Sequence, residues 1–255
     1  MSPPRVNVLG VGVSALNPAL AVETIAGWIA RRERRYVCVS GVHGVMESQR
    51  DPALRRIHNE AGLVTPDGMP LVWMLKAAGH RESDRVYGPD LMLALLAESE
   101  KRGWRHYLYG ASEETQAALR ASIARRFPGA TVAGGWSPPF RPLTEQEEED
   151  AVARINDSGA DIVWVGLSTP KQERWMASHR AVLDAPVLIG VGAAFDFHAG
   201  RVRQAPRAIQ RSGMEWAFRL AMEPRRLWRR YLRNNPEFAM LVLAQKTGLR
   251  RWSIE

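Results

Sequence analysis

The sequence predicts an α/β fold, a Rossmann-like parallel sheet with helices on both faces, followed by a basic helical C-terminal appendage. Short apolar runs alternate with amphipathic stretches over the first 200 residues, and several runs are nearly continuous in β-branched residues, as buried parallel strands are. The 255-residue chain is 45% hydrophobic, enough for one buried domain with an appendage. The positive charge gathers at the end of the chain, which sets that segment apart.

The elements follow from this alternation. Ser112 and Thr144 stand where helix N-caps are expected, and Pro70, Pro89 and Pro170 suit the first turns of helices. We expect strands at residues 5–9, 36–40, 62–65, 106–109, 130–133, 161–165 and 186–191, and helices at 18–32, 51–60, 70–78, 89–102, 113–127, 145–156 and 170–179.

A domain boundary is expected near residues 200–206, giving an α/β core over 1–200 and an appendage over 201–255. Residues 134–142 are rich in turn formers and are expected to be an irregular loop. The appendage is expected to form helices over 207–223, 224–233 and 236–247, punctuated by Pro224 and Pro236.

The net charge of the whole chain is +8, and it is unevenly distributed. Residues 200–255 hold 13 basic and 4 acidic side chains, giving +9, while the rest of the chain carries −1. Such a segment requires an anionic partner, which is nucleic acid, acidic lipid or a phosphate-bearing substrate.

Composition excludes several classes of protein. The single cysteine, Cys38, allows no internal disulfide and no thiolate metal site, which favours a reducing, cytoplasmic compartment. No zinc motif, Asp-x-Asp or Walker loop is present, so no metal or cofactor is expected. The first residues lack the apolar region of a signal peptide, and no apolar run reaches the roughly 18 residues of a membrane span. Any membrane contact is therefore expected to be peripheral.

The segment from Gly10 to Ala15 matches the dinucleotide-binding pattern G-x-G-x-x-A. That function requires a helix to begin at the glycines and an acidic residue to end the next strand. Here Pro18 delays the helix, and the next strand ends in Ser40-Gly41. An NAD-dependent oxidoreductase therefore remains an alternative, and a glycine-rich turn between a strand and a helix is the preferred interpretation.

Asp67 lies in a strand–turn–helix segment, Thr65-Pro66-Asp67-Gly68-Met69-Pro70. Because strand ends line the ligand crevice of an open α/β sheet, Asp67 would project into it, where a carboxylate can act as a general base. Gly68 completes the turn. A turn aspartate that bonds its own backbone is the structural alternative, and spacing alone leaves both open.

Two further strand ends carry candidate ligand-binding residues. Lys171, Gln172 and Glu173 open a helix after a strand, where free backbone N–H groups suit an anion or a sugar. Gly192 permits close backbone approach and Phe195 offers a flat apolar face. The structural alternatives are a solvated helix start and tight strand–helix packing.

Weaker candidates complete the predicted site. Ser40 and His43 follow the second strand and Gly110 ends another, so all three could face the same crevice. In the appendage, arginines recur near helical spacing between tryptophans and leucines, a pattern that suits a diphosphate, an anionic bilayer or nucleic acid. The arginines of interest are Arg219, Arg226, Arg229 and Arg230.

Six ordered blocks make the sequence resemble the WecG/TagA/CpsF family of bacterial glycosyltransferases over nearly the whole chain. The dipeptide Asp51-Pro52 also matches the family pattern. The blocks are Thr65-Pro66-Asp67-Gly68-Met69-Pro70, Gly88-Pro89-Asp90-Leu91-Met92, Pro170-Lys171-Gln172-Glu173, Gly190-Val191-Gly192-Ala193-Ala194-Phe195-Asp196, Glu215-Trp216-Ala217-Phe218-Arg219, and Glu223-Pro224-Arg225-Arg226 with Arg230-Tyr231.

The resemblance implies an inverting, metal-independent transfer of a sugar from a UDP-sugar to a polyprenyl-diphosphate-linked saccharide, at the inner face of the cell membrane. It places the general base on Asp67, a sugar contact on Gln172, and diphosphate contacts on Arg219, Arg226 and either Arg229 or Arg230. It also implies a role in exopolysaccharide or cell-envelope polysaccharide synthesis.

One departure from the family concerns the donor sugar. Many members have a threonine and an asparagine after the second strand, where this chain has Ser40 and Gly41, and His43 follows as a substitute contact. We therefore expect a cytoplasmic, peripheral membrane glycosyltransferase that binds no nucleic acid, with homo-oligomerisation left open. The alternatives are the NAD-dependent oxidoreductase and a basic nucleic-acid-binding module.

Overall fold

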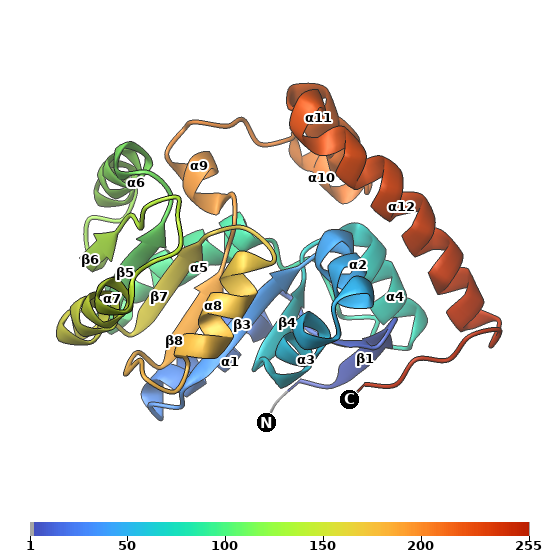
Figure 1. Cartoon of the computed structure of the whole chain (residues 1–255), viewed down its shortest axis with the longest axis horizontal. Coiled ribbons are helices and arrows are strands. Elements are labelled where there is room, and N and C mark those ends of the chain that lie inside the picture. The colour runs from blue at the N-terminus through green and yellow to red at the C-terminus, as the bar shows by residue number, and fades with distance from the viewer. Residues whose placement is uncertain (1–2, 255) are drawn as a thin grey trace. The chain divides into compact units, whose positions relative to one another are not determined.

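The computed structural model describes residues 3–254, and the chain divides into two compact units (Figure 1). The first unit comprises the residues up to Asn17, Val39–Tyr87 and the residues from Gln204 on, and the second comprises Pro18–Cys38 and Gly88–Arg203. The C-terminal segment thus belongs with the segment that holds Asp67. The boundary expected at residue 200 stays a prediction.

The sheet confirms the predicted α/β fold. Its six strands run in the order β4-β3-β8-β7-β5-β6, and the successive pairs from β3 to β6 are parallel. Strand β3 has its last two residues in the first unit, beside β4. The strands are β3 (Arg35–Ser40), β4 (Leu63–Pro66), β5 (Arg105–Gly110), β6 (Thr131–Trp136), β7 (Ile162–Gly166) and β8 (Val187–Gly190).

Helices surround the strands of the second unit, with α8 in front of them and α5 behind in Figure 1. Both predicted N-caps are confirmed: Ser112 Oγ accepts from Thr115 N–H, and Thr144 forms a capping box with Glu147. The helices are α1 (Pro18–Ala30), α5 (Gly88–Arg102), α6 (Glu113–Arg126), α7 (Glu145–Asp157), α8 (Lys171–His179) and α9 (Ala194–His198).

The first unit begins with an antiparallel hairpin, β1 (Arg5–Val8) and β2 (Val11–Ser14), that lies outside the parallel sheet. The prediction of a parallel strand followed by a β–α turn is therefore wrong here. Gly10, at φ +82°, makes the turn of the hairpin, and a strand follows it instead of a helix. The helix N-terminus that a dinucleotide pyrophosphate requires is absent at Gly10, which removes the structural basis of the NAD alternative.

The remaining helices of the first unit differ from the prediction in three places. A helix over 42–50 went unrecognised, and the stretch 207–223 is two helices separated at Gly213, whose φ is +80°. The last helix continues through Pro236 instead of ending before it. The helices are α2 (Val42–Arg50), α3 (Pro52–Glu60), α4 (Met69–Ala77), α10 (Arg207–Arg211), α11 (Glu215–Met222) and α12 (Pro224–Lys246).

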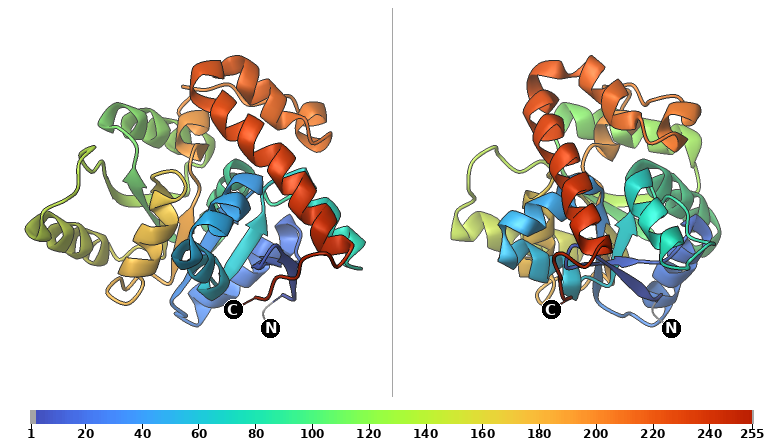
Figure 2. Two further views of the ribbon diagram at one scale, coloured as in Figure 1. Left: turned by 45° about the vertical axis from the view of Figure 1, so that its right-hand side comes forward. Right: turned by 90° about the vertical axis from the view of Figure 1, so that its right-hand side faces the viewer.

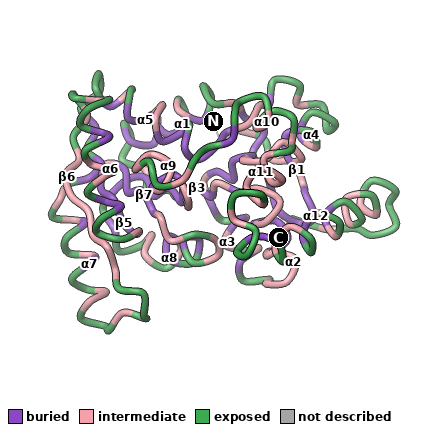
Figure 3. Tube along the Cα trace, turned by 90° about the horizontal axis from the view of Figure 1, so that it is seen from above, coloured by how far each residue is buried: buried purple, intermediate pink, exposed green. Residues whose placement is uncertain are grey.

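Helix α12 tolerates Pro236 because of where the proline faces. An internal proline leaves the carbonyl four residues earlier without its bond, here that of Leu232. Leu232 and Pro236 are both exposed, so water can reach that carbonyl, while Leu227, Asn234 and Phe238 are buried and hold the helix in place. Figure 3 shows the exposed side of this helix.

Strand β6 extends into the stretch that was expected to be a loop. Gly134, Gly135 and Trp136 pair with β5 at Tyr107, Leu108 and Tyr109. A Cβ on Gly134 would lie 2.7 Å from the Tyr107 ring, and one on Gly135 would lie 2.7 Å from the Leu108 carbonyl oxygen. The two glycines therefore serve close packing within the sheet, where the sequence suggested a turn.

The chain after α12 returns to the N-terminal hairpin (Figure 2). Trp252 donates from Nε1 to Gln49 Oε1 at 2.9 Å, and its carbonyl oxygen accepts from Asn7 Nδ2 at 2.7 Å. Gln245, in the last turn of α12, accepts from Leu9 N–H and donates to the Asn7 carbonyl. The far end of α12 is thereby fixed to the first unit.

A buried histidine in the second unit makes stability depend on pH. Trp164 Nε1 donates to His106 Nδ1 at 3.0 Å, and His106 Nε2 lies 2.7 Å from Ser99 Oγ. Burial lowers the pKa of His106 to about 4 from 6.5, so folding favours the neutral ring. The unfolded chain binds the proton first, and stability falls as pH decreases from about 6.5 towards 4, by about 3 kcal/mol in full.

We expect urea unfolding to show this loss directly. The free energy of unfolding of the wild type should fall more between pH 7 and pH 4.5 than that of His106→Gln. His80→Gln, at the turn after α4, is the matched control and should keep the wild-type pH dependence. An equal pH dependence in all three proteins would contradict the assignment.

Candidate functional site

Asp67 lies directly after β4, beside the end of β3, because its N–H donates to the Ser40 carbonyl at 3.0 Å. Two helices begin at this point, α2 with Gly41 as N-cap and α4 with Gly68 as N-cap, and neither has a side-chain capping bond. A Cβ on Gly41 would still lie 3.9 Å from Asp67 Oδ2. The carboxylate of Asp67 thus lies close to Gly41, where α2 and α4 begin.

Arg85 joins Asp67 to the C-terminal segment. Its Nε donates to the Asp67 carbonyl oxygen, and one terminal nitrogen lies 3.9 Å from Asp67 Oδ1 and forms an ion pair with Glu215 of α11. Arg85 and Glu215 are only 11% and 13% exposed. Burial alone would lower the pKa of Arg85, and the carboxylates of Asp67 and Glu215 outweigh it and raise the pKa. Arg85 therefore stays charged and bridges both acids.

Two tyrosines, the buried Tyr87 and the half-buried Tyr231, connect this cluster with the arginines of the C-terminal segment. Tyr87 lies under the Arg85 guanidinium, 4.0 Å from ring centroid to Cζ. Burial raises the pKa of both Tyr87 and Tyr231; the charges of Asp67 and Glu215 add to the shift, and that of Arg219 opposes it. Arg219 therefore lies within electrostatic range of the site around Asp67.

Three of the four predicted diphosphate arginines form one cluster. Burial lowers the pKa of Arg230, and the nearby charges of Arg219 and Arg226 lower it further. Like charges held close together create a strong positive potential that an anion would neutralise. Arg226 also pairs with Glu223, and Arg229 points elsewhere, with its guanidinium 5.2 Å from the ring centroid of Trp228.

The other two first-unit candidates differ in their partners. Ser40 is 2% exposed, its Oγ makes no hydrogen bond with the described residues, and a Cβ on Gly44 would lie 2.2 Å from that oxygen. His43 Nδ1 lies 3.1 Å from Asn234 Nδ2 of α12. Burial, with the charges of Arg230 and Arg50, lowers the pKa of His43 to about 4, so the ring is neutral at pH 7.

Most of the candidate residues in the second unit are buried. Gln172 is 2% exposed; its Oε1 accepts from Gly192 N–H at 2.9 Å and its Nε2 donates to Glu173 Oε1 at 3.1 Å. Glu173 also accepts from Thr169 Oγ1 at 2.8 Å. Gln172 thus fixes the loop that follows β8 at the carboxyl end of the sheet, while Lys171 is exposed in the first turn of α8.

Glycines bring the strand ends of the second unit close together. A Cβ on Gly110 would lie 2.7 Å from the Gly166 carbonyl oxygen, and one on Gly166 would lie 2.8 Å from the ring of Phe195. Phe195 is 1% exposed, so it packs against β7 and leaves little of its face to a ligand in this arrangement. Gly192, at φ +52°, shapes the loop that Gln172 holds.

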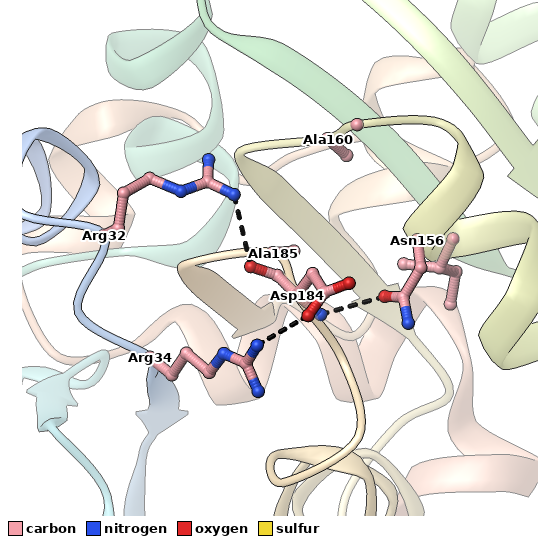
Figure 4. Close-up of a pocket in the computed structure, with 8 residues that line it drawn as sticks. Arg32, Arg34, Asn156, Ala160, Asp184 and Ala185 are labelled. Carbon is pink, nitrogen blue, oxygen red and sulfur yellow. Dashed lines mark hydrogen bonds and ion pairs between the residues drawn. The ribbon is translucent and has the colours of Figure 1, made fainter.

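None of the candidates lines the surface cleft of about 380 Å³ in the second unit (Figure 4). Arg34 pairs there with Asp184, and Asn156 Oδ1 accepts from Asp184 N–H at 2.9 Å. Arg32 pairs with Asp161. These polar groups satisfy one another, so the cleft shows no set of groups awaiting a ligand.

Sequence reasoning missed several residues around Asp67. Arg85, Tyr87 and Asn234 were not candidates, because the contacts of Arg85 with residues 67 and 215, and of Asn234 with residues 43 and 50, arise only on folding. Glu215 and Tyr231 stood in the motif blocks without a role. An arginine two residues before a tyrosine is not a recognisable sequence motif, so the contacts of Arg85 and Tyr87 could be found only from the structure.

Two absences hold for residues 3–254. No cluster of three histidine, cysteine, aspartate or glutamate side chains there could hold a metal ion. None of the helices described is both long and apolar enough to span a bilayer.

Comparison with known proteins identifies the family. The chain is 30% identical over 197 residues to an N-acetylglucosaminyldiphosphoundecaprenol N-acetyl-beta-D-mannosaminyltransferase of Bacillus spizizenii, covering 77% of this chain and 74% of the relative. A protein of the same description from Bacillus subtilis is 30% identical over 188 residues, covering 74% and 71%. The profile of the Glycosyl transferase WecG/TagA/CpsF family matches residues 6–252. The chain therefore belongs to the Glycosyl transferase WecG/TagA/CpsF family and is a glycosyltransferase.

Proposed function

We propose that this glycosyltransferase moves a sugar from a UDP-sugar to a polyprenyl-diphosphate-linked saccharide during cell-envelope polysaccharide synthesis. The names of the Bacillus relatives describe a transferase that acts on an undecaprenol-diphosphate-linked sugar, which supports the acceptor class. The observation that carries the proposal is the joining of one carboxylate, Asp67, to an arginine cluster by Arg85 and Glu215 within one unit.

The proposed mechanism is a single displacement with inversion. Asp67 removes the proton from the acceptor hydroxyl, whose oxygen attacks the anomeric carbon of the donor as UDP leaves. Arg219, Arg226 and Arg230 stabilise the charge that develops on the diphosphate, the task that a metal ion performs in other transferases. Within the first unit, the donor contacts fall to Ser40, His43 and Gly68.

A transfer assay tests the proposal. Purified protein with a panel of UDP-sugars and a lipid-diphosphate-linked saccharide should form a glycosylated lipid and UDP, with full activity in EDTA. Arg219→Ala and Arg230→Ala should raise the KM for lipid-diphosphate substrates, whereas Arg225→Ala, an exposed neighbour, is the matched control. Absence of transfer across the panel, or activity only with added metal, would contradict the proposal.

The exposed face of α12 is proposed to bind the surface of an anionic membrane. This would be the cytoplasmic side, where a polyprenyl-diphosphate-linked saccharide is presented. Large apolar side chains recur there every three to eight residues, and arginines flank them. The exposed members are Trp228, Leu232, Met240 and Leu243, which we call the α12 stripe.

We expect the α12 stripe to govern membrane binding. The protein should float with liposomes that contain anionic lipid, and Leu232→Glu with Leu243→Glu should abolish flotation because each carboxylate would enter the lipid interface. Val182→Glu, an exposed apolar residue of the second unit, is the control. Binding to DNA in a gel shift, with no flotation, would favour the nucleic-acid alternative.

A further inference from the structure

Asn234 is buried on α12 and bonds two residues of α2. Its Oδ1 accepts from Arg50 Nη1 at 2.9 Å, and its Nδ2 lies 3.1 Å from His43 Nδ1. Only 3% of Asn234 is exposed, so water does not compete for these bonds. Because a guanidinium can only donate, the Arg50 bond fixes the oxygen end of the amide, and the other end must donate.

The tautomer of His43 follows from this orientation. A nitrogen that accepts from the Asn234 amide carries no proton, so the ring proton lies on Nε2. Nε2 makes no hydrogen bond to residues within the part of the chain that the structure describes, and the side chain is 25% exposed. His43 therefore presents one N–H donor that its own fold does not use.

Burial, together with the charges of Arg230 and Arg50, lowers the pKa of His43 and keeps the ring neutral. Glu47 and Arg50 face it from α2, with Glu47 Oε1 3.7 Å from Nδ1, and Arg230 acts on it from α12. Arg50 also pairs with both Glu47 and Glu237 of α12, so each of these carboxylates has a guanidinium partner. A neutral donor thus sits beside the arginine cluster, and its direction is set before any ligand arrives.

We propose that Asn234 is a positioning residue that holds His43 as the Nε2–H tautomer, ready to donate to an oxygen of the sugar nucleotide. The ligand in this statement rests on the proposed function, whereas the tautomer is a property of the protein alone. The ligand oxygen belongs either to the diphosphate or to a sugar hydroxyl, and both accept the same hydrogen bond.

Nitrogen-15 NMR of the full chain tests the tautomer without any substrate. We expect the His43 signals, assigned by their loss in His43→Gln, to show an unprotonated Nδ1 and a protonated Nε2 from pH 8 down to about 5. In Asn234→Asp the carboxylate can only accept, so the proton should move to Nδ1 and the pKa of His43 should rise. Asn235→Asp adds the same charge one residue away and is the control. A wild-type ring protonated on Nδ1 would overturn the proposal.

Kinetics separate positioning from a structural role. In Asn234→Asp, neutral His43 has lost its Nε2 proton, so kcat/KM should be about tenfold below wild type at high pH and recover as the ring protonates at lower pH. Asn235→Asp should keep the wild-type profile. A uniform loss across pH, or no loss, would overturn the proposal.

Binding measurements identify the ligand oxygen. His43→Ala should weaken UDP and UDP-sugar equally if the donor bond is to the diphosphate, and UDP-sugar alone if it is to a sugar hydroxyl. Unchanged affinity for both would overturn the proposal. If wild-type protein transfers no sugar from any UDP-sugar, the proposed function fails, while the NMR result still decides the role of Asn234.

Discussion

Asp67→Asn should lower kcat by about 10²–10⁴-fold while leaving UDP-sugar affinity within a few-fold of wild type. An amide of the same shape keeps the turn at the end of β4 but cannot take a proton from the acceptor hydroxyl. The backbone bonds to Ser40 and Arg85 involve the main chain of residue 67 and survive the change. The measurement is single-turnover transfer, with donor binding followed by calorimetry.

Asp157→Asn is the matched control, since Asp157 is exposed at the end of α7. It should transfer sugar at the wild-type rate. Turnover by Asp67→Asn within threefold of wild type would remove Asp67 as the base. Loss of donor binding together with turnover would instead assign Asp67 to binding.

Replacing Arg85 should strongly destabilise the first unit. Arg85→Met leaves the Glu215 carboxylate, which is only 13% exposed, without its ion pair. Removing one partner of a fully buried pair costs about 3–5 kcal/mol, so we expect a loss of about 3 kcal/mol for this nearly buried pair. Urea unfolding measures the change in the free energy of unfolding. Transfer activity should fall as well, because Arg85 holds the Asp67 main chain.

A double-mutant cycle isolates the pair. Arg85→Met combined with Glu215→Leu should recover much of the lost stability, because the Glu215 carboxylate that lost its ion pair is removed as well, but should not recover activity. Arg81→Met, at an exposed position four residues earlier, is the control. Additive losses in the double variant would show that the two residues do not act as a pair.

The sequence predicts the sheet well because parallel strands are buried on both faces and read as apolar runs. It fails at glycines, whose signal is ambiguous: Gly10 makes a hairpin, whereas Gly134 and Gly135 continue a strand. The sequence also predicts a helix end at Pro236 that the structure lacks. Local propensity does not tell whether the proline lies on the side of the helix that faces water. Backbone conformation at such residues is decided by neighbours distant in the chain.

The candidate site was likewise predicted only in part from the sequence. Asp67 and the arginines were identified from motif order. The structure joins Asp67 to Arg219 through Arg85 and Tyr87, which lie outside the motif blocks, and through Glu215, to which its block gave no role. Gln172 lies as expected at a strand end, but its amide is engaged by Gly192 and Glu173. Hydrogen-bond partners of this kind are long-range and leave no periodic trace in a sequence.

Helix α12 is continuous from Pro224 to Lys246, so it fixes the distance and the angle between side chains along its axis. At about 1.5 Å per residue, Leu243 stands about 20 Å along the axis from Arg230, and each residue turns the helix by about 100°. The phase between the arginine cluster and the distal part of the α12 stripe is therefore fixed. One residue inserted at 235–236 would rotate that part out of phase, whereas four would nearly restore it. Relatives that differ in length here should do so by whole turns.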